Sequence, residues 1–228
     1  MRILALDTST QICSTALLSA DALITRELLS EQRGHAAHIL KMIDAVLSEA
    51  GIALADVQAL AFGRGPGAFT GVRLAASIAQ GLAFAAHLPV VPVSDLRAVA
   101  QRALDEEPEL AHVLVCQDAR MQELYWACFE RGADGLAAVL GDEHVSSAGN
   151  LSLPQRWRDG VGAAGQGFRI HPELTRRWPF VRVFDELLPR AVEIARLAAP
   201  AVASGTTVCP QEALPVYVRD EVARPSRN

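Results

Sequence analysis

The predicted order of strands and helices limits what this chain can fold into more than any other feature of the sequence. Three short strands come first, and helices then alternate with strands up to about residue 104. The expected strands cover residues 2–7, 12–19, 22–29, 56–62 and 89–93, and the expected helices cover 36–50, 70–87 and a segment after residue 94. Thr70 and Ser94 are candidate caps of the last two helices. This order predicts an α/β fold in which a strand meander precedes helix–strand units.

The second half of the chain looks like a shorter version of the first, with strands first and a helix last. Strands are expected at 111–116, 124–130 and 136–140, a glycine-rich turn at 160–167 and an apolar helix at 188–203. The charged stretch 105–109 marks the expected boundary, giving an N-terminal subdomain of residues 1–104 and a smaller, diverged C-terminal subdomain of residues 105–228. The order resembles the actin-like and RNase H-like folds, in which two subdomains each have a mixed sheet flanked by helices.

The composition is that of a compact globular protein. Of 228 residues, 50% are hydrophobic and 21% are charged, and Gly, Arg or Asp interrupts each apolar run before it reaches the length of a membrane span. Asp7 follows the apolar start too soon for a signal peptide, so we expect a cytoplasmic protein without a membrane partner. The formal net charge is −5 and Lys41 is the only lysine, which disfavours unaided binding to tRNA phosphates. An arginine patch assembled by folding stays open.

A carboxylate and three hydroxyl residues follow the first expected strand. Asp7, Thr8, Ser9 and Thr10 stand where actin-like ATPases and RNase H-like enzymes place their first functional acid and a phosphate-binding turn. These four are candidate nucleotide-binding residues. Phosphate loops usually contain glycine so that the backbone can approach the anion, and this loop has none. The alternative is that Asp7 and Ser9 satisfy the amides of their own turn.

The segment 63–73, Gly-Arg-Gly-Pro-Gly-Ala-Phe-Thr-Gly-Val-Arg, is the most unusual part of the sequence. It is not a Walker A loop, because no Lys-Ser/Thr follows its last glycine, and it lacks the GxGxxG spacing of dinucleotide-binding loops. Glycines at a helix start allow free amides to meet an anion or a partner's side chain. The alternative is that Gly67 and Gly71 permit close helix packing and that Arg64 is solvated.

No other set of residues indicates a catalytic or metal site. His35 and His38 are three residues apart, without the glutamate and third ligand of a zinc site, and no GxSxG motif occurs. The four cysteines are scattered without a CxxC pair. Asp118, Arg120 and Glu123 form a polar cluster after a strand, which is either catalytic or an ion-paired turn. The histidine and cysteine spacing therefore predicts no metal site, whereas the Asp118 cluster and the loop after the first strand leave catalysis and nucleotide binding open.

Several segments, taken together and in order, resemble the TsaB (YeaZ) family of bacterial proteins that support formation of threonylcarbamoyladenosine on tRNA. They are the start at 3–10, the residues His35, Leu40 and Ile43 on the first helix, the loop 63–73, the helix segment 80–83, the polar segment 118–126 and the end at 215–219. The resemblance is dense in the N-terminal half and thin between about residues 132 and 208. It implies the fold of the actin, sugar-kinase and Hsp70 superfamily and a paralogous relation to the transferase TsaD.

The resemblance also implies a pseudo-enzyme, a non-catalytic scaffold subunit that binds TsaD and works with the ATPase TsaE. Such a subunit would form a homodimer when alone and a heterodimer with TsaD, and would meet tRNA only indirectly, through the complex. A nucleotide, ATP or ADP, at the interface with TsaD is left open. Two alternatives are a glycoprotease-like peptidase of the M22 type, and an independent actin-like ATPase with a phosphate loop among Gly162, Gly165 and Gly167.

By the same resemblance, the first two helices and the glycine loop form the partner or dimer interface. The implied interface residues are His35, His38, Ile39, Met42, Ile43, Gly65, Pro66, Gly67, Phe69, Thr70, Gly71, Arg73, Leu74, Ala76, Ile78 and Ala79. The small residues of helix 70–87 would let a partner helix approach closely, whereas the alternative is that both helices simply face the core. Ala68 stands where the family loop commonly has serine, which removes a hydroxyl that could bind an anion.

Overall fold

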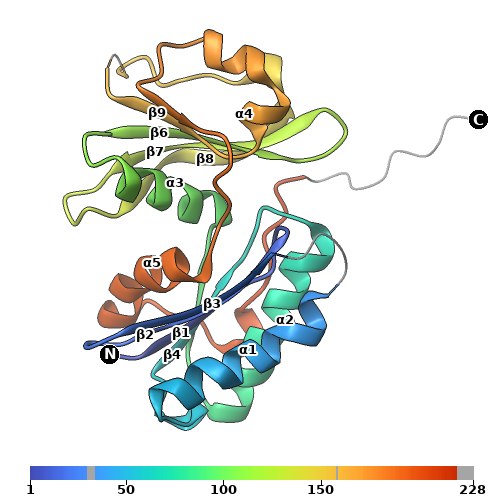
Figure 1. The fold of residues 1–228 in the computed structure, drawn as a ribbon, viewed down its shortest axis with the longest axis vertical. Helices are drawn as coiled ribbons and strands as arrows, with labels where there is room; N and C mark the ends of the chain where they lie inside the picture. The colour runs from blue at the N-terminus through green and yellow to red at the C-terminus, as the bar shows by residue number, and fades with distance from the viewer. Residues whose placement is uncertain (30–33, 158, 220–228) are drawn as a thin grey trace, which may run out of the picture.

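The first half of the chain folds into a five-stranded mixed sheet, in the lower part of Figure 1, in the order β3-β2-β1-β4-β5. The computed structural model describes residues 1–29, 34–157 and 159–219. The strands are β1 (Ile3–Asp7), β2 (Ile12–Leu18), β3 (Leu23–Leu29), β4 (Ala59–Gly63) and β5 (Val90–Val93). The first three form an antiparallel meander, whereas helical crossovers bring β4 and β5 parallel to β1. Helices α1 (His35–Ala50) and α2 (Phe69–Ala86) cover one face.

The second half forms another five-stranded sheet with the same connectivity. Its strands are β6 (His112–Asp118), β7 (Glu123–Arg131), β8 (Ala137–Ser147), β9 (Val161–Ala164) and β10 (Arg182–Phe184), in the order β10-β9-β6-β7-β8. The strands β6, β7 and β8 are an antiparallel meander, and β9 and β10 run parallel to β6. The short helix α4 (Gly167–Ile170) lies on the outer face. Each sheet therefore repeats the other in topology, as the sequence suggested.

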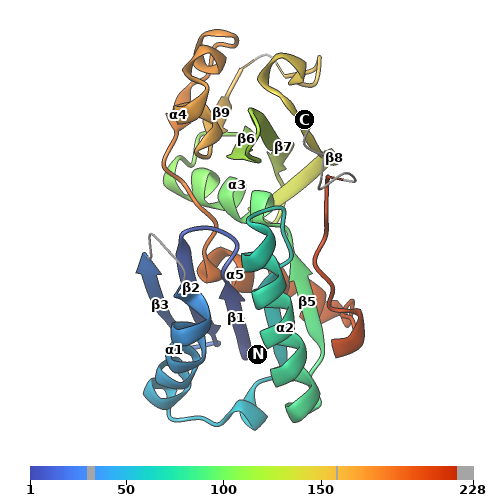
Figure 2. The same ribbon diagram turned by 90° about the vertical axis from the view of Figure 1, so that its right-hand side faces the viewer.

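Two helices lie between the sheets and contact each other there, α3 (Asp95–Glu106) and α5 (Ala191–Ser204) (Figures 1 and 2). α3 packs on the C-terminal sheet, where Leu96 and Leu104 join Phe129 in one core cluster. α5 packs on the N-terminal sheet, where Ile194 joins Ile3 in another. Since each sheet then has helices on both faces, its central strands are buried and read as continuous apolar runs. The predicted fold class, an actin-like α/β fold with two mixed sheets flanked by helices, is confirmed.

The expected boundary at residues 104/105 separates the strands of the two sheets, but it does not separate their helices. α3 begins before the boundary and packs on the later sheet, and α5 lies after the boundary and packs on the earlier sheet. Each half thus takes one covering helix from the other half of the sequence. The division of the chain into 1–104 and 105–228 stays a prediction, and this exchange of helices is what couples the two halves.

Several element limits differ from the expected ones. Ala68, not Thr70, is the N-cap of α2, because the chain turns into the helix two residues earlier and Thr70 lies exposed in its first turn. Ser94 caps α3 as predicted, since its Oγ accepts a hydrogen bond from Arg97 N at 3.1 Å. Half of the glycine-rich segment 160–167, which was expected to be a turn, forms strand β9. The strand β10 was not predicted, because three residues carry no readable alternation. Short 3-10 helices lie at Leu54–Asp56, Ala148–Asn150, Pro172–Arg176 and Pro210–Glu212.

Four alanines of α2 face the core of this chain, whereas Gly81 and Ala85 are exposed. Ala75, Ala76, Ala79 and Ala83 are buried, and the helix contacts β4 and β1. Their small size lets an 18-residue helix lie close to the sheet. By length and composition α2 could also cross a membrane, contrary to the expectation that no apolar run is long enough, but a core helix passes the same test.

Candidate functional site

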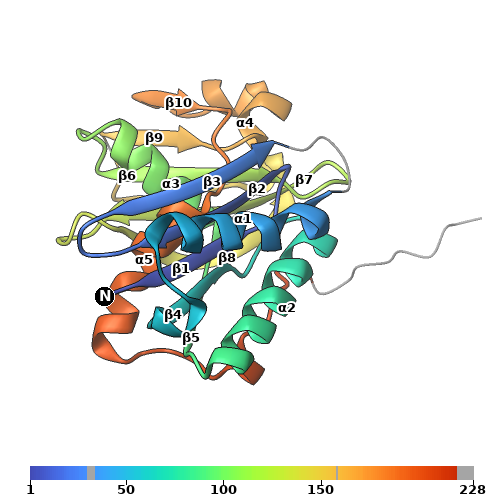
Figure 3. The same cartoon turned by 60° about the horizontal axis from the view of Figure 1, so that its bottom comes forward.

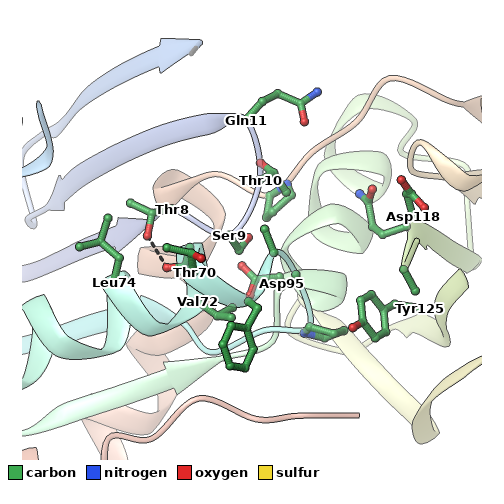
Figure 4. Close-up of a pocket in the computed structure, with 18 of the residues that line it drawn as sticks. Thr8, Ser9, Thr10, Gln11, Thr70, Val72, Leu74, Asp95, Asp118 and Tyr125 are labelled. Atoms are coloured by element: carbon green, nitrogen blue, oxygen red, sulfur yellow. Dashed lines mark hydrogen bonds between the residues drawn. The ribbon is translucent and has the colours of Figure 1, made fainter. Parts of the chain in front are cut away.

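A cleft of about 1470 Å3 lies between the two halves of the molecule. The N-terminal half contributes the loop after β1, the start of α1, the glycine loop and the start of α2. The C-terminal half contributes the ends of β6 and β7, and residues 216–219 lie along the cleft as well. In Figure 4, Thr8, Ser9 and Asp95 lie on one side, and Asp118 and Tyr125 lie on the other. Three of the four candidate nucleotide-binding residues, Thr8, Ser9 and Thr10, line this cleft.

The polar groups of the loop after β1 are used inside the protein. Asp7, Thr8 and Ser9 are buried, and Thr8 Oγ1 donates to the carbonyl of Gly71 at 2.7 Å. Ser9 N and Ser9 Oγ donate to Asp7 Oδ1 at 3.1 and 3.2 Å. The carbonyl of Ser9 accepts from Ala68 N at 2.8 Å. These contacts favour the interpretation in which the loop satisfies its own turn, and nucleotide binding by Asp7, Thr8, Ser9 and Thr10 stays a prediction.

The glycine loop lies directly on that turn, which is what its glycines permit. A Cβ on Gly71 would lie 2.0 Å from the carbonyl oxygen of Thr8, and a Cβ on Gly67 would lie 2.8 Å from Ser9. Gly65 has a φ of +101° and precedes a cis peptide bond to Pro66. The alternative reading, in which Gly67 and Gly71 permit close packing, therefore describes these two glycines in the structure.

Asp95 is a site residue that sequence analysis missed. It begins α3 and is buried against Asp7, and its Oδ2 accepts from Gly65 N at 2.5 Å. Burial raises the pKa of both carboxyls, and the negative charge of Asp7 raises the pKa of Asp95 further. The sequence signal was an acid beside a capping serine, which is common in helix first turns and points to no partner.

Arg64 connects the two halves instead of being solvated. Its guanidinium pairs with Glu143 of β8 at 3.2 Å, and Ser94 Oγ donates to the same carboxylate. Glu143 thus contacts the glycine loop and the cap of α3 at once. The side chains of Arg64 and Glu143 are 25% and 10% exposed, so the pair is shielded enough to hold the halves in register.

The polar cluster after β6 is an ion-paired turn. Arg120 N donates to Asp118 Oδ1 at 2.7 Å, and the Arg120 guanidinium lies 3.3 Å from the same carboxylate. Arg120, Met121 and Gln122 have φ values of 61°, 56° and 60°, a left-handed conformation that is costly for residues with a Cβ. Glu123 pairs with Arg219 near the end of the described chain. The ion-pair alternative therefore accounts for the cluster.

The segment 213–219 crosses from one half to the other along the cleft. Val216 N donates to the carbonyl of Arg64 at 2.8 Å, and the hydroxyl of Tyr217 accepts from Arg73 Nε at 2.7 Å. The guanidinium of Arg73 also stacks 3.8 Å over the ring of Phe69. Arg219 donates to the carbonyl of Ala119 at 3.1 Å and reaches Glu123. We call this segment the strap; sequence analysis noted its residues but no contact.

Comparison with known proteins decides the family. A family model described as TsaD, tRNA N6-adenosine threonylcarbamoyltransferase, matches residues 27–181. The tRNA threonylcarbamoyladenosine biosynthesis protein TsaB of Escherichia coli (strain K12) is 40% identical over 98% of this chain and 96% of its own length. TsaB of Haemophilus influenzae is 39% identical over 97% and 95%. This chain belongs to the TsaB (YeaZ) family.

Two solved structures of Pseudomonas aeruginosa proteins agree with that assignment to the TsaB family. One, named YeaZ, has a TM-score of 0.88 and 42% identity over 95% of this chain and 99% of that one. The other, described as an uncharacterized protein with similarity to peptidase YEAZ, has a TM-score of 0.89 and 41% identity over 96% and 99%. The resemblance on which the sequence analysis relied is therefore confirmed, and so is the relation to TsaD at the level of the family model.

The implied interface residues of this TsaB family member divide into three groups by exposure. Buried in the chain are Ile39, Ile43, Gly65, Pro66, Gly71, Ala76 and Ala79; partly buried are His35, Met42, Gly67, Leu74 and Ile78; exposed are His38, Phe69, Thr70 and Arg73. The idea that the small residues of α2 face a partner is wrong for the buried alanines, because composition cannot tell which side of an apolar helix meets the sheet. The interface itself stays a prediction, now limited to the outer sides of α1 and α2.

Three of the four cysteine thiols are buried, whereas Cys209 lies at the surface. Burial, with a smaller effect from the charge of Asp7, raises the pKa of the Cys13 thiol to about 11; burial raises that of Cys128 to about 12. Cys116 is fully buried and its pKa is raised as well. The His35 ring lies with Nε2 2.9 Å from the carbonyl oxygen of Thr10. Among residues 1–29, 34–157 and 159–219, no group of three His, Cys, Asp or Glu side chains could hold a metal.

Proposed function

We propose that this protein is a non-catalytic subunit required for formation of N6-threonylcarbamoyladenosine in tRNA, which binds and supports the transferase TsaD together with the ATPase TsaE. The names of its TsaB relatives place those proteins in this pathway. The protein would act in the cytoplasm, have no cofactor of its own, and meet tRNA only through the complex. A nucleotide at the interface with TsaD belongs to the same proposal and rests on family resemblance alone.

One observation carries the non-catalytic part of the proposal: the loop where an actin-like enzyme would bind phosphate is occupied from within. Thr8 Oγ1 donates to the carbonyl of Gly71, and Ala68 N donates to the carbonyl of Ser9. Groups that already have buried partners gain little from a ligand, because each new contact replaces an existing one. The raised pKa values of the Cys13, Cys116 and Cys128 thiols also argue against any of these three as a nucleophile.

The outer sides of α1 and α2 support the partner-binding part. Both helices cover the same face of the N-terminal sheet, as Figure 3 shows. Leu40 of α1 is 52% exposed, and Phe84 and Phe69 of α2 are 66% and 46% exposed. A partner that covered the outer sides of both helices would bury these apolar side chains. The same surface would pair with a second copy when TsaD is absent.

The test is size-exclusion chromatography with light scattering, with TsaD from the same organism, followed by a tRNA modification assay with TsaE. Leu40→Glu and Gly81→Arg change only the outer surface, since a Cβ on Gly81 would meet nothing within 4 Å. We expect a heterodimer with the wild type, a loss of at least about tenfold in affinity with either variant, and no loss with Val139→Glu on β8, a control that is 51% exposed.

The outcomes separate the scaffold from its alternatives. Absence of a complex at micromolar concentration would remove the scaffold proposal. Hydrolysis of a peptide by this chain alone, lost in His35→Ala, would favour the peptidase, and nucleotide binding by this chain alone would favour the ATPase. Substitutions at Gly71 or Ala79 are unsuitable for this test, because both positions are buried and a large side chain at either would unfold the chain.

A further inference from the structure

Two buried carboxyl groups, those of Asp7 and Asp95, meet where β1 ends and α3 begins. Their residues are 0% and 2% exposed. Oδ2 of Asp7 and Oδ1 of Asp95 are buried, and neither has a donor among the described residues. A Cβ on Gly63 would lie 2.1 Å from the first oxygen and 2.3 Å from the second, so both oxygens approach the same point. The absence of a side chain at Gly63 leaves room for them to meet.

The other two oxygens of the pair have fixed hydrogen-bond roles. Asp7 Oδ1 accepts from Ser9 N, and Asp95 Oδ2 accepts from Gly65 N. Backbone N–H groups only donate, so both of these oxygens must be acceptors. The two facing oxygens would also both be acceptors if each carboxyl were ionised, and two anions this close in a buried site repel. A proton on one of them turns the repulsion into a hydrogen bond.

We propose that Asp7 and Asp95 share a single proton and that the pair positions the glycine loop 63–67 beneath the start of α2. Gly65 N donates to Asp95 Oδ2, and Asp95 N donates in return to the carbonyl of Gly65 at 3.0 Å. Asp7 holds Ser9, whose carbonyl accepts from Ala68 N just before α2. The pair thus ties the loop at both ends. Its importance for a partner rests on the proposed function, because the loop belongs to the implied interface.

The surroundings favour a pair with one net negative charge. Burial is the largest cause that raises the pKa of each carboxyl, and the charge of Asp7 is the next cause at Asp95. The titratable groups that face the pair from neighbouring elements are Cys13 of β2 and His35 of α1. The pKa of Cys13 is about 11, so this thiol is neutral, and a charged His35 would lower the pKa of Asp7. The pair therefore carries one net negative charge, and its single proton lies between the two facing oxygens.

Asparagine substitutions test the shared proton through a non-additive pattern. In Asp95→Asn the amide nitrogen donates to Asp7 and the amide oxygen accepts from Gly65 N. In Asp7→Asn the amide nitrogen donates to Asp95 and the amide oxygen accepts from Ser9 N. In the double variant Ser9 N and Gly65 N fix both amide oxygens, so two amide nitrogens face each other. At pH 6 we expect the melting temperature of each single variant to lie no more than about 3 °C below that of the wild type. The double variant should fall about 5 °C or more below the sum of the single shifts; additive shifts would overturn the proposal.

The pH dependence gives a second test that needs only a variant expected to fold. Above about pH 4 the folded wild-type pair holds one proton that the unfolded chain has lost, so wild-type stability falls as pH rises until Asp95 ionises. Asp95→Asn lacks this proton. Between pH 5 and 7 its melting temperature should therefore rise relative to the wild type by about 3–5 °C per pH unit. Asp44→Asn on the exposed side of α1 is the control and should show no such trend. A constant difference between Asp95→Asn and the wild type would refute the shared proton.

Partner binding separates this inference from the proposed function. Asp95→Ala removes the acceptor of Gly65 N. Measured at a temperature at which this variant is folded, its affinity for TsaD should be weaker by about tenfold or more, whereas Asp95→Asn should bind like the wild type. Equal binding by Asp95→Ala would mean that the pair does not position the loop for a partner. If the wild type itself fails to bind TsaD, the proposed function falls, and the melting data still decide whether the proton is shared.

Discussion

The strands β1 and β6 hold the same place in their sheets, and each ends in an aspartate, yet the two carboxylates have opposite surroundings. Asp7 is fully buried, whereas the Asp118 side chain is 27% exposed and pairs with Arg120. The helix that follows the fourth strand of each half explains the difference. α2 spans Phe69–Ala86, and its counterpart α4 spans only Gly167–Ile170. The long helix and the loop before it cover the strand end, and the short helix leaves the other strand end open to the cleft.

Both halves nevertheless have a glycine with positive φ after the fourth strand of their sheet. Gly65 and Gly165 have φ values of +101° and +104°, which L side chains rarely adopt. A Cβ on Gly65 would lie 2.9 Å from the carbonyl oxygen of Val216, and one on Gly165 would lie 2.3 Å from that of Cys116. The comparison teaches that the crossover geometry is common to both halves, and that the length of the following helix decides whether the strand end becomes buried structure or cleft wall.

Gly71→Ala should produce the largest loss of stability, because it disrupts the packing of α2 on the end of β1. The added Cβ would lie 2.0 Å from the carbonyl oxygen of Thr8, and this backbone atom cannot rotate away. Overpacking of a well-packed site costs about 1–3 kcal/mol and sometimes more. We expect the free energy of unfolding to fall by about 3 kcal/mol, near the upper end of this range, which lowers the melting temperature by about 6–12 °C in a protein of this size. Thermal unfolding followed by circular dichroism measures it.

Two further glycine variants make this experiment a comparison. Gly81→Ala lies in the same helix with nothing near its Cβ, so higher helix propensity should stabilise the fold by about 0.5–1 kcal/mol. Gly167→Ala would meet Cys116 and Leu124 at 2.7–2.9 Å, which is a milder clash with atoms that are partly side chain. Its loss should lie between the other two. An equal loss of stability for Gly167→Ala and Gly71→Ala would mean that α4 packs on the end of β6 as tightly as α2 packs on the end of β1.

Arg219→Ala should have a smaller effect on stability, confined to the C-terminal half, where the end of β6 is open to the cleft. The substitution removes the donors to the carbonyl of Ala119 and to Glu123, and so releases the strap from the strained turn 120–122. A lost charged hydrogen bond with a partly buried partner costs about 1–2 kcal/mol. Hydrogen exchange should show faster exchange in the β6–β7 turn and unchanged exchange in β1. Arg169→Ala, on a 54% exposed side chain, is the matched control, and faster exchange in both variants would argue against a strap-specific effect.

Local patterns in the sequence predicted most of the strands and helices, because apolar runs and stop signals such as Gly51 act over a few residues. Gly51 adopts the left-handed conformation that ends α1, as its position predicts. The pairing of Asp95 with Asp7 could not be predicted, since it depends on which strand ends the sheet brings together. The orientation of α2 was misjudged because alanine suits either a partner or a core. The contacts of Arg219 with the β6–β7 turn were likewise invisible, because they join residues far apart in the chain.

Asp118→Asn should have the smallest effect, and it tests the comparison between the two strand ends most directly. The amide oxygen can still accept from Arg120 N, and the lost ion pair involves an arginine that is 88% exposed, so solvent screens it. We expect a change in melting temperature of less than about 2 °C. Thermal unfolding followed by circular dichroism measures it. A clearly larger loss would mean that the open and closed strand ends depend on their carboxylates alike.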